Sequence, residues 1–351
     1  MKPEISIILP CYNVSRWVEK CIKSIWSNEF TNYEIICIND CSTDNTLHIL
    51  NALAEKDGRI KVIDLEENGG LANGRRIGVQ NAAGNYVAFV DPDDWVDSNY
   101  LSTLYNPIKT FGDIDIVILP YCYKEFKYCI SVKYGLFDDS LKKEFGKPID
   151  VSFSNKVMQT FFGRNVFSVS AWNKLYKTSV LREIPEIKVF YQEDLLLNMY
   201  AFKHVKRILF LDRICYHYRS GGGSATNPKM ITDFLEVIRL KTLWLKENIV
   251  NYEQHLPWIC FELKNVIYAW ISRLIAEGKS KDTIQALYEG TITDSHLEFL
   301  AGTKTSAPDS FASKDFQTLL SRDFSRIYTQ AKRRVSFKSK VMNYFRKILS
   351  Y

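Results

Sequence analysis

The chain has 351 residues, of which 46% are hydrophobic and 25% are charged, so its composition is that of a globular protein and excludes a disordered one. Neither an apolar leader at the start nor a run of about 18 uncharged apolar residues occurs, so we expect no signal peptide and no transmembrane span. The eight cysteines form no Cys-x-x-Cys pair, which favours reduced thiols and a cytoplasmic protein.

The net charge of +6 comes from the C-terminal end of the chain. Residues 324–351 carry eight of the 46 Lys and Arg side chains and no acid, which leaves 38 basic against 40 acidic side chains in residues 1–323. The body is therefore close to neutral, and we expect it to bind no nucleic acid.

Apolar runs alternate with helical patterns at the start of the chain. They predict strands over residues 4–10, 33–40, 59–67 and 85–91, with helices over 15–28, 42–57 and 70–84 between them. This order predicts an α/β fold with a mostly parallel sheet flanked by helices. Ligands of such sheets bind beyond the carboxyl ends of the strands, and two of those ends, Asn39–Asp40 and Asp91–Asp94, are polar.

The pattern changes after residue 120. Residues 121–135 alternate and predict antiparallel strands, residues 190–205 predict a helix with an acidic first turn, and residues 207–219 predict further strands. From about Pro228 all patterns are helical. We expect three parts: residues 1–227, a helical region over 228–330, and a basic tail helix over 331–351.

Four aspartates stand within seven positions at the end of the fourth strand. Asp91, Asp93, Asp94 and Asp97 repel one another, so a positive group is needed nearby. Asp91 and Asp93 form an Asp-x-Asp, whose alternate carboxylates can face Mg²⁺ or Mn²⁺, although surface turns often carry the same motif. We expect Asp94 and Asp97 to cap the following turn and helix.

Two arginines stand on the predicted helix that faces the same edge of the sheet. Either Arg75 or Arg76 can reach a diphosphate, and the other is then a solvated surface charge. For Asp40 the alternative to ligand binding is capping of the next helix, although Ser42, Thr43 and Asp44 are closer to that position.

Five segments together resemble the family 2 glycosyltransferases with a GT-A fold. In chain order they read SIILPCYN, INDCSTDNT, NGGLANGRRIGVQNAAGNYVAFVDPDDW, AWNKLYK and YQEDLLLN, and the likeness covers residues 4–220. The resemblance implies a GT-A domain over residues 1–227 that binds a nucleotide sugar and carries the catalytic site. It also implies an inverting, metal-dependent transfer from a UDP-sugar to a glycan or lipid-linked acceptor, of the kind found in bacterial surface-polysaccharide biosynthesis.

The resemblance also assigns roles to residues around the donor. It implies that Asp93 and Asp91 hold Mn²⁺ or Mg²⁺ on the diphosphate. It places His217, with the loop Gly221–Ser224, where relatives supply a further metal or phosphate contact. The residues implied for the donor nucleotide are Pro10, Tyr12, Asp40, Arg75 and Asp91.

The pair Glu193–Asp194 is the implied catalytic group. Glycosyl transfer needs a base near the acceptor hydroxyl. The resemblance gives this role to Asp194, with Glu193 as the rival. Without the resemblance, an acidic pair at a helix start would be interpreted as capping. Trp172 packs either beneath the acceptor or in the core.

Other functions remain open at this stage. A non-catalytic nucleotide-sugar or glycan-binding protein could keep the same fold, but would be expected to lack Asp93 or Asp194. A peripheral membrane scaffold could be built on the helical part. A dinucleotide-dependent dehydrogenase is disfavoured because no Gly-x-Gly-x-x-Gly follows the first strand.

The tail reads as an amphipathic helix over Arg333–Leu349, with basic side chains around an apolar face. It either docks on the protein or lies on an anionic membrane surface, which would place the protein at the inner face of the cytoplasmic membrane. The apolar face consists of Phe337, Val341, Tyr344, Phe345 and Ile348.

Overall fold

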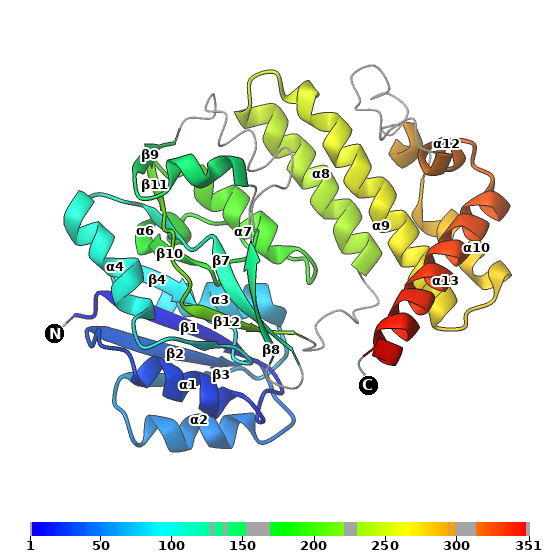
Figure 1. The fold of residues 1–351 in the computed structure, drawn as a ribbon. Helices are drawn as coiled ribbons and strands as arrows, with labels where there is room; N and C mark the ends of the chain where they lie inside the picture. The colour runs from blue at the N-terminus through cyan, green and yellow to red at the C-terminus, as the bar shows by residue number, and fades with distance from the viewer. Residues whose placement is uncertain are drawn as a thin grey trace. The chain divides into compact units, whose positions relative to one another are not determined.

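The computed structural model describes residues 2–126, 130–135, 139–151, 169–220, 230–293, 295–298 and 314–348. The chain divides into two compact units, Met1–Asn227 and Pro228–Tyr351 (Figure 1). The first unit is built on β-sheets and the second is helical, so the expected α/β class with a helical C-terminal region is confirmed.

The main sheet of the first unit has eight strands among the described residues, in the order β3-β2-β1-β4-β10-β6-β11-β9. The neighbours β3-β2-β1-β4 are all parallel, as predicted, and β11 is parallel to β6. In contrast, β10 runs antiparallel to both β4 and β6, and β9 runs antiparallel to β11. The strands are β1 (Ile5–Cys11), β2 (Tyr33–Asn39), β3 (Ile60–Asp64), β4 (Tyr86–Phe89), β6 (Ile116–Ile118), β9 (Pro148–Asp150), β10 (Lys174–Lys177) and β11 (Arg207–Phe210).

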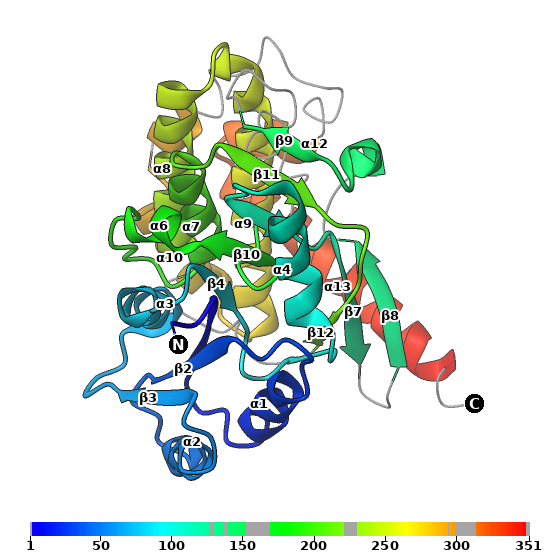
Figure 2. The same cartoon turned by 90° about the vertical axis from the view of Figure 1, so that its left-hand side faces the viewer.

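Helices cover both faces of this sheet (Figure 2). Side chains alternate along β1, so Ile7 and Leu9 join the core beneath α1 (Val18–Trp26), α2 (Thr46–Ala54) and α4 (Tyr100–Phe111), whereas Ile8 faces α3 (Gly70–Asn81). The helix α3 packs closely because it presents glycine there: a Cβ on Gly78 would lie 2.3 Å from Cγ2 of Ile8. This close packing sets α3, and with it Arg75, directly on the sheet.

A second sheet brings distant segments to the aspartate-rich strand end. Its order is β5-β12-β7-β8, formed by β5 (Trp95–Val96), β12 (Tyr216–Arg219), β7 (Tyr121–Phe126) and β8 (Ile130–Gly135). The predicted antiparallel pairing of β7 with β8 is confirmed. Because β12 pairs with β5, residues 216–219 lie beside Asp91–Asp97. The short helix η1 (Asp139–Glu144) follows β8, and the helices α6 (Thr178–Arg182) and α7 (Glu193–Phe202) follow β10.

The second unit is organised around one long helix. The helix α9 (Leu256–Ala276) packs against α8 (Met230–Asn248), α10 (Lys281–Thr291) and α13 (Phe324–Ile348), with Leu263 and Ile267 buried. The shorter η2 (Tyr252–His255) and α12 (Lys314–Leu320) also belong to this unit. No helix within the described residues is both long enough and apolar enough to span a bilayer.

The predicted tail helix is part of α13, which starts at Phe324, nine residues before the expected Arg333, and continues without a break across position 331. Its first turns dock on α9: Ile327 and Ala331 are buried, and the Tyr268 hydroxyl donates to the side chain of Gln330. For residues 337–348 the structure describes the helical backbone but not the side chains, so the predicted apolar face lies outside what it describes.

Candidate functional site

A buried arginine connects the two acidic segments singled out in the sequence. Arg75 extends from α3 and is only 2% exposed. One of its terminal nitrogens lies 3.4 Å from Oδ1 of Asp91, and the other contacts Oδ1 of Asp194 and lies 3.4 Å from Oε1 of Glu193. The strand end after β4 and the first turn of α7 are therefore held together through one guanidinium.

Burial and mutual repulsion shift the titration of these groups. Burial raises the pKa of Asp91 to about 6, despite the opposing effect of Arg75. Burial, together with the neighbouring Asp194, raises the pKa of Glu193 to about 7. For Arg75, burial acts to lower the pKa, but the three carboxylates outweigh it and the net shift is upward. One cation thus faces three acidic groups, two of which resist ionisation.

The segment before β10 fixes the orientation of Asp194. The backbone N–H of Ala171 donates to Oδ2 of Asp194 at 3.0 Å. Asn198, one turn further along α7, donates to the backbone carbonyls of Asp194 and Val169. Asp194 is therefore held from two sides, by Arg75 on one oxygen and by Ala171 on the other.

A buried lysine binds the same segment before β10. Nζ of Lys174 donates to the carbonyl of Ser170 at 2.5 Å and to Oδ1 of Asn173 at 2.8 Å. Burial lowers the pKa of Lys174 to about 7, against the effect of Asp194. Trp172, also in this segment, is buried and stacks on Tyr216 with ring centroids 4.4 Å apart, so it belongs to the core.

Asp94 is not a cap, contrary to the expectation from the sequence. Its carboxylate is buried and accepts hydrogen bonds from the Tyr216 hydroxyl and the Arg219 backbone N–H. Nε of Arg219 donates to the carbonyl of Asp93. Burial, with the neighbours Asp91 and Asp93, raises the pKa of Asp94 well above its usual range, and burial also raises that of Asp93. Protein groups, Arg75 and Arg219, thus supply positive charge near the aspartates.

The structure gives His217 and Asp97 different partners from those expected. The two ring nitrogens of His217 lie 2.9 Å from Oδ1 of Asp97 and 2.7 Å from Oε1 of Glu125, and the ring stacks between Trp95 and Tyr123. Because both nitrogens are engaged, no lone pair faces a metal in this arrangement. The Asp97 side chain binds His217, and α4 has no side-chain cap.

The residues expected to bind the nucleotide lie at neighbouring strand ends. Pro10 is buried in β1, and Tyr12, just beyond it, is 49% exposed. Asp40 follows β2, is buried, and accepts the backbone N–H groups of Gly69 and Gly70. Its carboxylate therefore also orders the start of α3.

The strand end after β4 offers two carboxylates to a cation. Asp91 is only loosely tied to Arg75, and Asp93 has no hydrogen bond from another side chain among the described residues. Two carboxylates and the oxygens of a diphosphate suit Mg²⁺ or Mn²⁺, which are bound largely through substrate phosphates. A cluster of three or more His, Cys, Asp or Glu ligands does not occur within the described ranges.

Several residues of the site were missed from the sequence. Asn198 of α7 and Arg219 of β12 bind backbone carbonyls of the acidic segments, and Lys174 of β10 binds the segment that contacts Asp194. Asn198 had a local signal, because it is the polar residue within the apolar run of α7. Lys174 and Arg219 had none, because their importance depends on strand pairings between distant segments.

Comparisons with known proteins place the chain among glycosyltransferases. The family described as "Glycosyl transferase family 2" matches residues 6–184. Glycosyltransferase GlyA of Streptococcus pneumoniae is 33% identical over 227 residues, which is 63% of this chain and 31% of GlyA. The uncharacterized glycosyltransferase EpsJ of Bacillus subtilis is 30% identical over 229 residues, 64% of each chain. The chain thus spans less than two thirds of these relatives.

The fold is also similar to a solved structure. Residues 1–349 of Staphylococcus aureus TarS, crystallised in complex with UDP-GlcNAc, superpose with a TM-score of 0.61 at 21% sequence identity. The superposition covers 96% of this chain and 92% of that one. At this identity the likeness establishes the shared fold, including the helical part.

Proposed function

Since the chain belongs to glycosyl transferase family 2, we propose that this glycosyltransferase moves a sugar from a UDP-sugar to a hydroxyl of a glycan or lipid-linked acceptor, with inversion. One observation carries the proposal: the Asp91 strand end and the Glu193–Asp194 pair meet at Arg75. An acidic strand end that suits a diphosphate-bound cation therefore adjoins carboxylates that suit proton transfer. A protein that only bound the nucleotide sugar would need the first feature alone.

The choice of UDP is supported by relatives. TarS is named a poly(ribitol-phosphate) β-N-acetylglucosaminyltransferase, and it has been crystallised in complex with UDP-GlcNAc and with UDP. The pocket for the uracil nucleotide would be formed by Pro10, Tyr12 and Asp40, with Arg75 behind it.

The cation would be held by Asp91 and Asp93 together with the donor diphosphate. Bound there, Mn²⁺ or Mg²⁺ would stabilise the negative charge that develops on the departing UDP. His217 is left out of this set because its nitrogens bind Asp97 and Glu125. The side chain of Asp93 is the more available of the two carboxylates, so we expect the cation to depend on it most.

Asp194 is the proposed base for the acceptor hydroxyl. The bonds from Arg75 and Ala171 fix its direction, and each carboxylate oxygen keeps a further lone pair for a hydroxyl proton. Glu193 is the competing candidate, because a pKa of about 7 suits proton transfer near neutral pH.

Paired substitutions test the assignment. Asp194→Asn should keep UDP affinity within about threefold and lose at least about a hundredfold in transfer rate, because it removes a proton acceptor and little volume. Glu193→Gln should retain more activity, and Glu186→Gln, at an exposed site, serves as the matched control. An inactive Glu193→Gln beside an active Asp194→Asn would reverse the roles, and full activity in both would remove the pair from the mechanism.

A further inference from the structure

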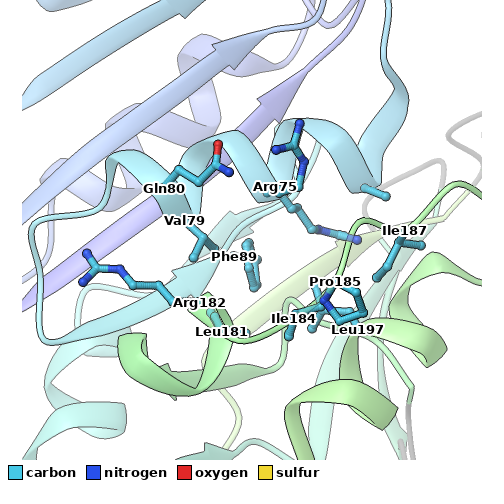
Figure 3. Close-up of a pocket in the computed structure, with 12 residues that line it drawn as sticks. Arg75, Val79, Gln80, Phe89, Leu181, Arg182, Ile184, Pro185, Ile187 and Leu197 are labelled. Carbon is cyan, nitrogen blue, oxygen red and sulfur yellow. The ribbon is translucent and has the colours of Figure 1, made fainter.

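The segment that connects α6 to α7 passes beside α3 and ends at the start of that helix. Ile187 lines the same cavity of about 110 Å³ as Arg75 of α3, and the two side chains lie at the same end of it (Figure 3). Phe190 continues this path to the first residue of α3, since a Cβ on Gly70 would lie 2.6 Å from Cε1 of Phe190. The ring of Phe190 therefore lies directly against the backbone of Gly70.

Phe190 thereby contacts a turn that is held by a buried carboxylate. The backbone N–H of Gly69 donates to Oδ1 of Asp40 at 2.8 Å, and that of Gly70 donates to Oδ2 at 2.9 Å. Gly70 has a φ of 80°, and any side chain on it would collide with Phe190, so glycine is required there. Because Phe190 and Asp40 both contact Gly70, a single residue separates the ring from the carboxylate.

The charge of Asp40 has no cationic partner in the part of the chain that the structure describes. Asp40 is only 4% exposed, and no Lys, Arg or His of the described ranges forms an ion pair with it. Each of its oxygens accepts one backbone N–H and keeps a further lone pair. A buried carboxylate with free lone pairs suits a ligand that donates an N–H group, because the new hydrogen bond offsets the cost of burial.

Three exposed apolar side chains gather around this carboxylate. Phe190 is 43% exposed, and Leu71, one residue beyond the turn, is 37% exposed. Tyr12 is 49% exposed and directly follows Cys11, whose carbonyl accepts the backbone N–H of Asp40 at 2.8 Å. Exposed apolar side chains that cluster at one place, instead of being scattered singly, are typical of a binding site.

Contacts on both sides of Phe190 in the chain hold its ring in place. Before it, Ile187 packs beside Arg75, and after it the Glu193–Asp194 pair binds the Arg75 guanidinium. Gln192, between the ring and the acidic pair, has a φ of 63°, a left-handed conformation that persists only where the surroundings fix it. The ring is therefore ordered before any ligand arrives, which lowers the entropy cost of binding.

We propose that Phe190 forms a wall of the pocket for the donor base, with one face of the base stacked on its ring. A nucleobase such as uracil has flat apolar faces and an N–H on its edge, so it meets the ring and the Asp40 carboxylate together. Stacking of a base on an aromatic side chain strengthens binding whatever the base is. The inference rests on the proposed function, because it needs a nucleotide donor.

Calorimetric titrations with UDP and with inorganic pyrophosphate, both in Mn²⁺, test this role. Pyrophosphate has the phosphates of the donor but no base, so it reports on the rest of the site. Phe190→Ala should weaken UDP by about tenfold or more and leave pyrophosphate within about twofold. Phe190→Leu, which can still pack on Gly70 but has no ring, should weaken UDP by about fivefold, whereas Phe190→Tyr should keep it within about twofold. Phe111→Ala removes a ring from α4 that is 41% exposed, and it is the matched control.

The inference is overturned if the parent chain binds UDP and Phe190→Ala binds it equally well. It is also overturned if Phe190→Ala weakens pyrophosphate by the same factor as UDP, or if Phe190→Leu matches Phe190→Tyr, because the ring would then act only on the structure of the turn. In these outcomes the parent still binds UDP, so the proposed function is untouched. A parent chain that binds pyrophosphate but not UDP would instead refute the UDP donor of the proposed function, and this inference with it.

Discussion

At the scale of single residues, the acidic strand end is stabilised by partners that lie far away in the sequence. Arg75 neutralises Asp91 and the α7 pair, and Asp94 is held by Tyr216 and Arg219. Removing one partner of such a buried set leaves a buried charge without a counter-charge. The resulting loss in the free energy of unfolding is larger than the net stabilisation that the whole set provides.

The raised pKa of Glu193 predicts how stability depends on pH. A carboxyl whose pKa rises on folding, here from 4.5 to about 7, stabilises the fold in its protonated form. That contribution is complete below pH 4.5 and is lost as the pH rises through 7. Glu193→Gln should therefore flatten the fall in unfolding free energy between these pH values, by on the order of 2 kcal/mol.

Urea denaturation at a series of pH values measures this effect, with Glu186→Gln as the control at an exposed site. If the parent and Glu193→Gln lose stability in parallel between pH 4.5 and 7, Glu193 does not titrate as described.

Lys174 is expected to act on catalysis through the segment that holds Asp194. Lys174→Met keeps the side-chain length but removes the bonds to Ser170 and Asn173. We expect kcat to fall by about tenfold or more while the affinity for UDP changes little, because only the orientation of Asp194 is disturbed. Steady-state kinetics with a UDP titration separates the two effects, and an equal loss in both would indicate general unfolding instead. Lys177→Met, on the same strand and paired with Asp113, is the matched control.

At the scale of elements, the sequence predicts those strands and helices that are determined by the local pattern of apolar and polar residues. The strands β1 to β4 carry continuous buried runs between helical patterns, so their parallel order follows from the chain alone. The strand β10 was missed because it has only four residues and pairs antiparallel inside a mostly parallel sheet. Its pairing is decided by the space between β4 and β6, which no local pattern records.

The residues of the candidate site were likewise predicted only in part. Asp91 and Asp93 were singled out because they follow a strand, whereas the Glu193–Asp194 pair at the start of a helix was singled out only through the family resemblance. The expected capping by Asp94 and Asp97 was wrong because β12 supplies Tyr216, His217 and Arg219 as stronger partners. Those contacts join residues about 120 positions apart, and local capping rules cannot detect them.

The helix α13 carries a prediction of its own. Its first part docks on α9, with Arg334 stacked 4.3 Å from the Tyr268 ring. We expect the remaining turns to bind an anionic membrane surface, where each basic residue contributes about 1 kcal/mol before screening. Removing residues 337–351 keeps the docked part and should abolish co-sedimentation with anionic liposomes.

The matched control replaces Lys338, Lys340, Arg346 and Lys347 by Gln in the full chain, which keeps the apolar face and removes the charge. Both the truncation and the Gln substitutions should lower co-sedimentation only with anionic liposomes and only at low salt. If the truncated chain still binds these liposomes, the tail does not bind the membrane, and docking on the protein is the remaining interpretation.

At the scale of the whole molecule, the chain combines a unit built on β-sheets with a helical unit, and it belongs to glycosyl transferase family 2. We propose that the strand end after β4 binds a UDP donor through a divalent cation. Asp93 is the side chain on which this depends most.

Calorimetric titration of UDP, with Mn²⁺ and with excess chelator, tests that claim most directly. The parent should bind UDP at least about tenfold more tightly with Mn²⁺, Asp93→Asn should lose most of this difference, and Asp212→Asn, at an exposed site, should keep it. Equal UDP affinity with and without Mn²⁺ in the parent, or an undiminished Mn²⁺ effect in Asp93→Asn, would contradict it.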